Sequence, residues 1–359
     1  MRIAIDARPA EQEGFGIARY TTELIGALAA LDQVNEYCLI VNSDKLASRV
    51  AGWPNFSLKR ISADWLSLQE QLELPWALNQ IKPDLFHATS FVLPLLQNCR
   101  TVVTIHDLIH LVFPEHYGLK QAIYFKLLQN ALNRVDLIVA DSAATKSDLL
   151  RFYGLQPERI RVVHLAAGQG FRPLADAAVR GYRQDKGLPE RFILFVGGRK
   201  KHKNFRLLLE AWAKLAQKGG VAIPLVVTGG PDELTGEYSR LGQIICLGAV
   251  QGAELPYLYN AATLFVFPSL YEGFGLPPLE AMACGTPVIT TDVSSLPEVV
   301  GQAGLLVPPD DVDALAKAIE SVLEDESLAA RLSLAGLEQA KKFSWERCAR
   351  QTLAIYKTI

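Results

Sequence analysis

The stretch TLFVFPSLYEGFGLPPLEAMACG, residues 263–285, predicts a β-strand, a loop and an α-helix in immediate succession. It opens with a short apolar run, which is typical of a strand with both faces covered. Pro277 and Pro278 suit the first turn of a helix, where missing N–H groups cost little, and Gly285 suits the end of that helix. A strand that leads through a loop into a helix is the repeating unit of a parallel α/β fold.

The same alternation recurs along the chain in two series. Short runs rich in Val, Ile and Leu are each followed by a polar turn and a longer stretch with helical character. The first series is RIAIDAR (2–8), YCLIVN (37–42), DLFHATS (84–90), TVVTIHD (101–107), DLIVADS (136–142) and RVVHLA (161–166). The second is RFILFVGG (191–198), PLVVTGG (224–230), IICLGAV (244–250), TLFVFPS (263–269), PVITTD (287–292) and GLLVPP (304–309). The chain is therefore predicted to form two doubly wound parallel sheets.

The two series divide the chain into domains. Between them, residues 166–190 are richer in Gly, Pro and charge and carry no strand signal. We expect an N-terminal domain over residues 1–170, a linker over 171–190, a C-terminal domain over 191–342, and a C-terminal helix over 343–359 that is able to pack back on the first domain. Ligands of such folds bind at the carboxyl ends of the strands, so the informative residues should follow strands.

The composition excludes several classes of protein. The chain has 359 residues, of which 50% are hydrophobic and 21% charged, as in a well-packed globular enzyme. A formal net charge of −2 gives no sign of a nucleic-acid partner. The five cysteines are scattered and odd in number, which indicates neither a disulfide framework nor a zinc site. With no signal-peptide pattern and no apolar run of membrane-spanning length, we expect a cytoplasmic protein.

The loop and helix start at residues 272–280 favour an anion. Gly273 and Gly275 allow backbone amides to converge just ahead of the helix, and a helix N-terminus adds partial positive charge. Glu272 lies in the loop and Glu280 one turn into the helix, so two hydroxyl acceptors flank one phosphate site. The alternative is a purely structural role. Glu280 is then only a favourable acidic residue in the first helical turn, and the two glycines only form a turn.

The run SLYEGFGLPPLEAMACGTPVITTDVSSLPEVVGQAGLLVPPDD, residues 269–311, resembles the nucleotide-sugar-binding segment of the retaining group 1 glycosyltransferases. The resemblance includes their E-x7-E motif, as Glu272 and Glu280. It implies the α/β GT-B fold, with two Rossmann-like doubly wound parallel-sheet domains facing a central cleft. It also implies that Glu272 contacts hydroxyls of the donor sugar and that Glu280 holds the ribose hydroxyls. Phe274, Gly275 and Leu276 complete the expected substrate-binding segment.

A second cationic segment, LFVGGRKKHKN (194–204), follows a predicted strand. In the family that this chain resembles, an arginine and a lysine in this place bind the donor phosphates. Lys203 matches the lysine, whereas Arg199 is shifted by one place and leaves Gly198 at the usual arginine position. We assign both cations to catalysis, against the ordinary alternative of a solvated charge run.

Two residues of the N-terminal half complete the expected site. GFGIARY (14–20) is similar to the family's glycine-rich loop, and we predict that Gly16 binds substrate. The alternative is that Gly16 only forms a turn. The third glycine of a dinucleotide fold is absent, since Arg19 stands there, so a nicotinamide oxidoreductase is disfavoured. His106 follows the strand TVVTI and matches the family histidine near the reacting sugar. We assign it to catalysis; the alternative is a histidine that only satisfies local hydrogen bonds.

No metal or other cofactor is expected. The string DVD at 311–313 precedes a helix and does not follow a strand in the manner of metal-dependent sugar transferases. Lys203, Arg199 and helix dipoles would then neutralise the departing diphosphate.

The expected activity is retaining, metal-independent hexosyl transfer from a UDP-glucose-like or GDP-mannose-like donor to a glycan or lipid-linked acceptor in polysaccharide biosynthesis. A nucleotide-sugar 2-epimerase on the same fold and a non-catalytic sugar-nucleotide-binding protein stay open as alternatives. Residues 64–78 and 118–134 offer apolar and basic helical faces, which leave peripheral contact with the inner face of a membrane open.

Overall fold

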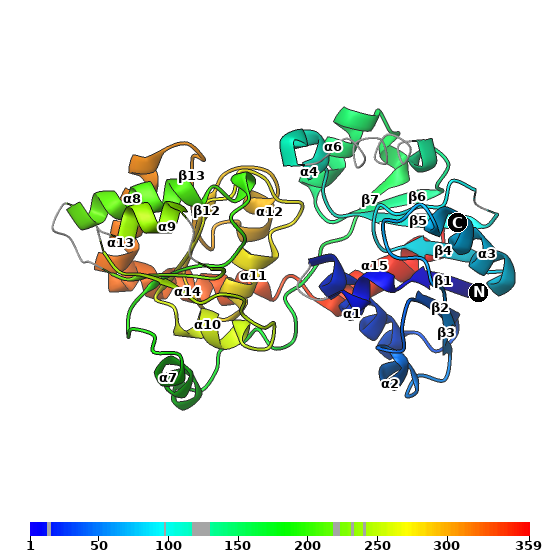
Figure 1. Ribbon diagram of the computed structural model, residues 1–359, viewed down its shortest axis with the longest axis horizontal. Helices are drawn as coiled ribbons and strands as arrows, with labels where there is room; N and C mark the ends of the chain where they lie inside the picture. Colours follow the sequence, from blue (N-terminus) through cyan, green and yellow to red (C-terminus); the bar gives the residue numbers. More distant parts are fainter. Residues whose placement is uncertain (13–15, 97, 117–129, 218–222, 231–232, 240–241) are drawn as a thin grey trace. The chain divides into compact units, whose positions relative to one another are not determined.

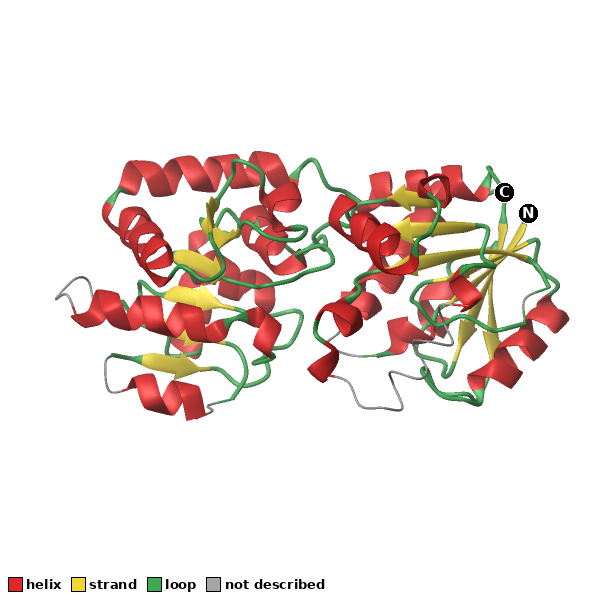
Figure 2. Ribbon diagram, turned by 90° about the horizontal axis from the view of Figure 1, so that it is seen from above, coloured by secondary structure: helices red, strands yellow, loops and turns green. Residues whose placement is uncertain are grey.

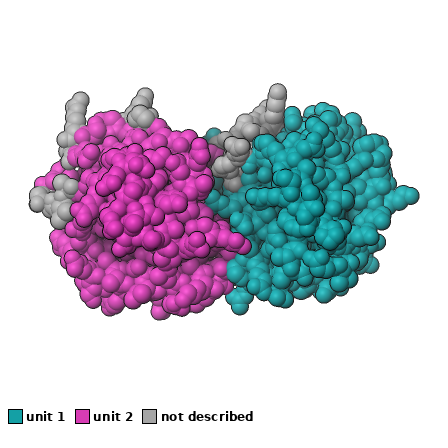
Figure 3. All heavy atoms as spheres, turned by 90° about the horizontal axis from the view of Figure 1, so that it is seen from below, with its two compact units in different colours: residues 1–165, 344–359 teal, residues 166–343 magenta. Residues whose placement is uncertain are grey.

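The structure, a computed structural model, describes residues 1–12, 16–96, 98–116, 130–217, 223–230, 233–239 and 242–359 (Figure 1). The chain forms two compact units, which are coloured separately in Figure 3. Unit 1 comprises residues 1–165 and 344–359, and unit 2 comprises residues 166–343. No helix in the described part of the chain is both long enough and apolar enough to cross a bilayer.

Unit 1 is built on a seven-stranded parallel sheet of order β3-β2-β1-β4-β5-β6-β7. Its strands are β1 (Arg2–Asp6), β2 (Glu36–Val41), β3 (Phe56–Arg60), β4 (Leu85–Ala88), β5 (Arg100–Ile105), β6 (Leu137–Ala140) and β7 (Ile160–Val162). Its α-helices are α1 (Gly16–Leu31), α2 (Ala47–Val50), α3 (Glu70–Ile81), α4 (Ile109–Val112), α6 (Ala143–Tyr153) and α15 (Trp345–Tyr356). Short 3-10 turns span Arg8–Glu11, Pro114–His116 and Pro157–Arg159.

Unit 2 is built on a six-stranded parallel sheet of order β10-β9-β8-β11-β12-β13. Its strands are β8 (Ile193–Phe195), β9 (Leu225–Val227), β10 (Ile244–Cys246), β11 (Leu264–Phe267), β12 (Val288–Thr291) and β13 (Leu305–Val307). Its helices are α7 (Asp176–Asp185), α8 (Phe205–Gln217), α9 (Glu233–Tyr238), α10 (Leu255–Ala261), α11 (Leu276–Ala283), α12 (Leu296–Val300), α13 (Val312–Glu324) and α14 (Glu326–Ala340), with a 3-10 turn at Lys201–Lys203.

Both sheets confirm the predicted parallel α/β architecture, with helices packed around each sheet (Figure 2). All four residues of β4, β6, β11 and β12 are buried, because helices cover both faces of the sheets; β6 and β11 are wholly apolar, whereas β4 contains His87 and β12 two threonines. The sequence analysis missed β3. This strand lies at the sheet edge and only one of its five residues, Phe56, is buried, so it lacks a continuous apolar run.

The segments that join the two units at either end of unit 2 contain helices. Residues 171–190, expected to be a linker, contain helix α7, which packs on α10 through the stacked rings of Tyr182 and Tyr257. At the other end, the chain returns to unit 1 as α15, whose Trp345 ring lies 6.2 Å from that of Tyr20 on α1. The side chain of Ser344 caps α15 by accepting a hydrogen bond from the Arg347 amide.

Candidate functional site

The two central strands of unit 2 lie at the point where the strand order reverses. Strand β8 has β9 on one side and β11 on the other, so the chain winds outward in both directions from the β8–β11 pair. In parallel α/β sheets, ligands bind beyond the carboxyl ends of the strands at such a point. The loops that follow β8 and β11, residues 196–204 and 268–275, carry most of the predicted site residues.

Lys203 and Glu272, one from each loop, form an ion pair. The Lys203 Nζ lies 2.6 Å from the Glu272 Oε1, and both side chains are largely but not fully buried, with 19% and 13% exposed. Ser269 Oγ donates a second hydrogen bond, of 2.6 Å, to the same oxygen. The structure thus brings together the two residues that the sequence assigned to the donor phosphates and to the donor sugar.

The loop that carries Glu272 is held by backbone contacts. Ser294 Oγ and Ser295 Oγ donate to the Glu272 carbonyl at 2.5 and 2.9 Å. Ser294 occupies the left-handed region at φ 55°, an uncommon conformation for a residue with a side chain. The Leu270 amide donates to the His202 carbonyl at 2.6 Å, which ties this loop to the one bearing Lys203. Glu272 is therefore fixed from several directions.

Helix α11 starts at the end of the same loop. Its N-cap, Gly275, has φ 105°, where glycine is favoured, and an added Cβ would lie 3.0 Å from Leu296 Cδ2. Leu276 is the first helical residue and Phe274 is buried in front of it. The first amides of a helix have no intrahelical partner and attract anions. The anion cradle expected from the sequence stays a prediction at this helix start.

Glu280 lies in α11 and is buried, with 3% of its surface exposed. Tyr259 of α10 donates a hydrogen bond of 3.1 Å from its hydroxyl to Glu280 Oε2. This bond fixes the carboxyl group on the side of α11 that faces α10.

Arg199 lies in the same loop as Lys203, but its guanidinium stacks on an aromatic ring. Its Cζ is 4.1 Å from the centre of the Phe205 ring, and its Nη1 donates to the Gly197 carbonyl at 3.4 Å. A guanidinium stacked by its face keeps N–H groups at its edge as donors.

His106 belongs to unit 1, at the carboxyl end of β5. Its Nδ1 lies 2.5 Å from Asp141 Oδ2, beyond β6, and its Nε2 lies 2.9 Å from the Thr89 carbonyl, beyond β4. Burial alone lowers the pKa of His106, but the Asp141 carboxylate outweighs it, and the pKa lies above its ordinary value. Gly16 is the exposed first residue of α1, whereas Gly14 lies outside the described residues.

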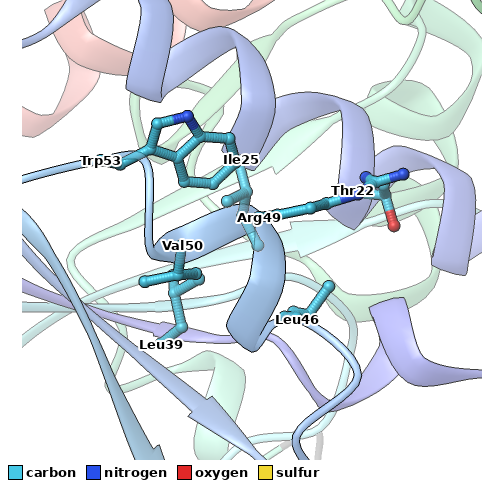
Figure 4. Close-up of a pocket in the computed structure, with 7 residues that line it drawn as sticks. All are labelled: Thr22, Ile25, Leu39, Leu46, Arg49, Val50 and Trp53. Carbon is cyan, nitrogen blue, oxygen red and sulfur yellow. The ribbon is translucent and has the colours of Figure 1, made fainter.

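Other features of the chain do not belong to this set. A cavity of about 10 Å³, drawn in Figure 4, lies among Thr22, Ile25, Leu39, Leu46, Arg49, Val50 and Trp53, and has room for one water molecule at most. In the DVD string, Asp311 caps α13 by accepting from the Ala314 amide, and Asp313 pairs with Lys214. Among the described residues, no group of three or more His, Cys, Asp or Glu is placed to hold a metal ion.

Three contacts in the site were not predicted from the sequence. Ser269 lies two residues beyond the end of β11, so its place after a strand was a usable signal. Asp141 directly follows β6, so its position was a usable signal as well; the residue that caps the next helix is Ser142, which accepts from the Thr145 amide. Tyr259 lies on another helix, and nothing in its sequence context indicates a bond to Glu280.

Comparison with known proteins identifies the chain. A family model described as "Glycosyl transferases group 1" matches residues 182–339, and one described as "Glycosyltransferase Family 4" matches residues 16–166. The O-antigen chain mannosyltransferase B of Escherichia coli is 34% identical over 382 residues, covering 100% of both chains. The chain belongs to the group 1 glycosyltransferases. It is an enzyme of the glycosyltransferase class.

Solved structures agree on the fold of this group 1 glycosyltransferase. Sucrose-phosphate synthase from Thermosynechococcus elongatus superposes with a TM-score of 0.77 at 24% identity, covering 100% of this chain and 98% of the other. Anabaena Alr3699/HepE in complex with UDP-glucose superposes with a TM-score of 0.79 at 18% identity, covering 100% of both chains. The GT-B fold expected from the sequence is confirmed.

Proposed function

We propose that this group 1 glycosyltransferase transfers a mannosyl group from a nucleotide diphosphate mannose to a glycan acceptor, with retention of configuration and without a divalent metal. The Lys203–Glu272 ion pair carries the proposal, because it sets a cation and a hydroxyl acceptor side by side next to the α11 N-terminus. The relative named O-antigen chain mannosyltransferase B supports mannose over glucose. Of the two donors expected from the sequence, only the GDP-mannose-like one carries mannose, so we propose GDP-mannose.

Four residues of unit 2 have separate roles in the proposed reaction: Lys203, Arg199, Glu272 and Glu280. Lys203 and the first amides of α11 bind the diphosphate, and Arg199, from the same loop as Lys203, is assigned to it as well. When the diphosphate takes over Lys203, the Glu272 carboxylate becomes free to accept hydrogen bonds from sugar hydroxyls. Glu280 accepts from the ribose hydroxyls.

Retention is expected to follow from attack on the same face as the departing phosphate. Glu272 keeps its bond from Ser269 and is assigned to the sugar hydroxyls, so it is a poor candidate for a covalent nucleophile. The bond from the anomeric carbon to the phosphate oxygen breaks, the acceptor oxygen bonds to that carbon, and the acceptor proton passes to the leaving phosphate. Proton NMR of the first product formed gives its anomeric configuration.

A donor panel tests the proposal. GDP-mannose, UDP-glucose and their free nucleotides are compared in thermal-shift and transfer assays, with a mannose-terminated oligosaccharide as acceptor. We expect GDP-mannose to stabilise the folded protein and to support transfer in excess EDTA. Loss of transfer in EDTA with recovery in Mg²⁺ contradicts metal independence. Conversion of the donor without acceptor indicates the 2-epimerase, and binding without turnover the non-catalytic protein.

We also propose that the enzyme works at the inner face of a membrane, through an apolar patch on unit 1. Leu72 and Trp76 lie on α3, and Leu68 lies two residues before it, so the three are spaced by four residues. Their exposed fractions are 78% for Leu68, 77% for Leu72 and 52% for Trp76. Leu96 is 72% exposed, and Gln71 of α3 binds the backbone of the neighbouring Leu95 at 2.9 Å. Lys59 Nζ lies 4.8 Å from the Trp76 ring centre, which adds a cation to the patch.

Such an arrangement of Leu, Trp and Lys is typical of segments that lie in the membrane interface. Co-sedimentation with vesicles of anionic phospholipid tests it, with Leu72→Ser as the variant and Leu334→Ser, at an exposed leucine of unit 2 outside the patch, as the control. Equal sedimentation of the two variants contradicts a role for the patch. Most of the second helical segment considered in the sequence, residues 118–134, lies outside the described residues.

A further inference from the structure

His106 uses both of its ring nitrogens in contacts with acceptors. The Thr89 backbone carbonyl, 2.9 Å from Nε2, can only accept a hydrogen bond, so Nε2 carries a proton. On the other side of the ring, Nδ1 and Asp141 Oδ2 are 2.5 Å apart. Two bare lone pairs at that distance repel, so a second proton lies between them. The histidine and the aspartate together hold one proton more than a neutral imidazole beside a carboxylate.

The surroundings of Asp141 favour placing this proton on the histidine. Asp141 is 1% exposed, and within the described part of the chain its Oδ1 has no hydrogen-bond partner. An ionised carboxylate that is buried with so few partners needs a charge beside it. The N-terminus of α6, which begins two residues later, also stabilises the carboxylate. An imidazolium at His106 therefore balances the charge of Asp141.

Among the described residues, the groups that interact with the ring do not supply a competing cation. The ring of Tyr20, on α1, meets His106 edge to face at a centroid distance of 4.7 Å. Asp107 adds a further favourable negative charge, and Cys348 of α15 interacts electrostatically with Asp141. His87 on β4 would oppose a charge on His106, but burial lowers the pKa of His87 to about 3 and keeps it neutral.

We propose that Asp141 is a positioning residue that keeps His106 as an imidazolium, so that His106 acts on the substrate as a hydrogen-bond donor and not as a general base. The inference rests on the proposed function for its catalytic meaning, although the charge state itself does not. The ligand group that it selects is an oxygen acceptor, either a sugar oxygen or a phosphate oxygen, which takes the Nε2–H now given to Thr89.

The alternative is a catalytic dyad in which Asp141 orients His106 to remove a proton from the acceptor hydroxyl. That role requires a free lone pair on Nε2, as in a serine hydrolase triad. Here Nε2 is the donor to a carbonyl. The two roles make opposite predictions for pH dependence. Activity of a general base rises as the imidazolium loses its proton, whereas activity that needs the donor falls.

Nitrogen-15 NMR of the full chain, labelled at histidine, tests the charge state without any variant. At pH 7.5 we expect both ring nitrogens of His106 to resonate in the imidazolium range, assigned by their loss in His106→Gln. His87 and His110 are internal controls, since burial lowers their pKa values to about 3 and about 4 and keeps them neutral. A neutral His106 at this pH overturns the inference and leaves the proposed function untouched.

The variant Asp141→Asn tests the role. An asparagine amide can donate to Nδ1, so His106 should become a neutral imidazole, and the alkaline fall of kcat/KM should move down by at least one pH unit. Asp141→Glu should restore the wild-type profile in part, and Asp107→Asn should keep the imidazolium signals. A kcat/KM that rises through the His106 titration overturns the donor role. If His106 is an imidazolium but the protein transfers no sugar from any donor, the proposed function is refuted and the charge state of His106 is not.

Discussion

A substitution can separate the effects that the Lys203–Glu272 ion pair has on nucleotide affinity and on turnover. In Glu272→Gln, the amide still accepts from Ser269 but no longer neutralises Lys203. A bound diphosphate then meets an uncompensated cation, so affinity for the free nucleotide should stay the same or increase. Turnover should fall by about 100-fold, the usual cost of losing one charged contact to the reacting group.

Calorimetry with the free nucleotide and initial rates of transfer measure the two effects. Glu210→Gln is a matched control, because Glu210 is an exposed partner of Arg206 on α8 and has no part in the site. Full activity of Glu272→Gln refutes its contact with the sugar.

Glu280 gives a second prediction at this scale. Glu280→Gln keeps the shape of a buried side chain and its bond from Tyr259, but weakens acceptance from ribose hydroxyls. Loss of a hydrogen bond to a charged group costs roughly 1.5–3 kcal/mol, so nucleotide affinity should fall about 10- to 100-fold. Tyr259→Phe, which leaves the carboxylate in place, should have a smaller effect by the same calorimetry. Equal affinities for Glu280→Gln and wild type remove Glu280 from the ribose.

Among the helices, α15 has the clearest energetic role. Its Tyr356 hydroxyl lies 2.6 Å from His87 Nδ1, His87 Nε2 lies 2.9 Å from Thr104 Oγ1, and that hydroxyl lies 2.8 Å from the hydroxyl of Tyr20. All four side chains are buried. This chain of hydrogen bonds joins α15 to β4, β5 and α1 inside unit 1.

Tyr356→Phe should destabilise unit 1 by about 1–3 kcal/mol, because it leaves His87 Nδ1 buried without its partner. Urea unfolding followed by tryptophan fluorescence measures this, since Trp53, Trp65, Trp76 and Trp345 all belong to unit 1. Tyr257→Phe, at a partly exposed ring of unit 2, is the control and should change stability by less than about 0.5 kcal/mol. Equal stability of Tyr356→Phe and wild type contradicts the role of the hydrogen-bond chain.

The elements also show what a sequence can predict. Strands buried on both faces, such as β6 and β11, are continuous apolar runs and were recognised, as was the helix from Leu276 that two prolines and a glycine delimit. The edge strand β3 and helix α7 have mixed surfaces without a decisive period. Lys203 and Glu272 could each be proposed from their place after a strand. Their mutual contact, and the bonds from Tyr259 and to Asp141, depend on packing between elements distant in the sequence.

At the scale of the whole molecule, buried histidines make stability depend on pH. The pKa of His87 is lowered to about 3 and that of His110 to about 4, against an ordinary 6.5. Between these values the unfolded chain binds more protons than the folded one, so stability falls as the pH falls below about 6.5. The raised pKa of His106 acts in the opposite sense, giving stability that is lost as the pH rises through its folded value.

We therefore expect unit 1 to lose up to about 1.4 kcal/mol per pH unit for each of His87 and His110 between pH 6 and pH 5. The free energy of unfolding in urea, measured at half-unit steps, tests this. His87→Gln, which cannot be protonated, should reduce the slope by about half. A slope that is the same in the variant and in wild type rules out His87 as its source.

The return of α15 to unit 1 bears on how the chain matures during synthesis. Residues 344–359 leave the ribosome after residues 166–343, yet they complete the core that residues 1–165 begin. Unit 2 is continuous in sequence and is fully available before them. The second unit can therefore finish folding while the first still waits for its final helix, which reverses the usual order in which nascent domains are completed.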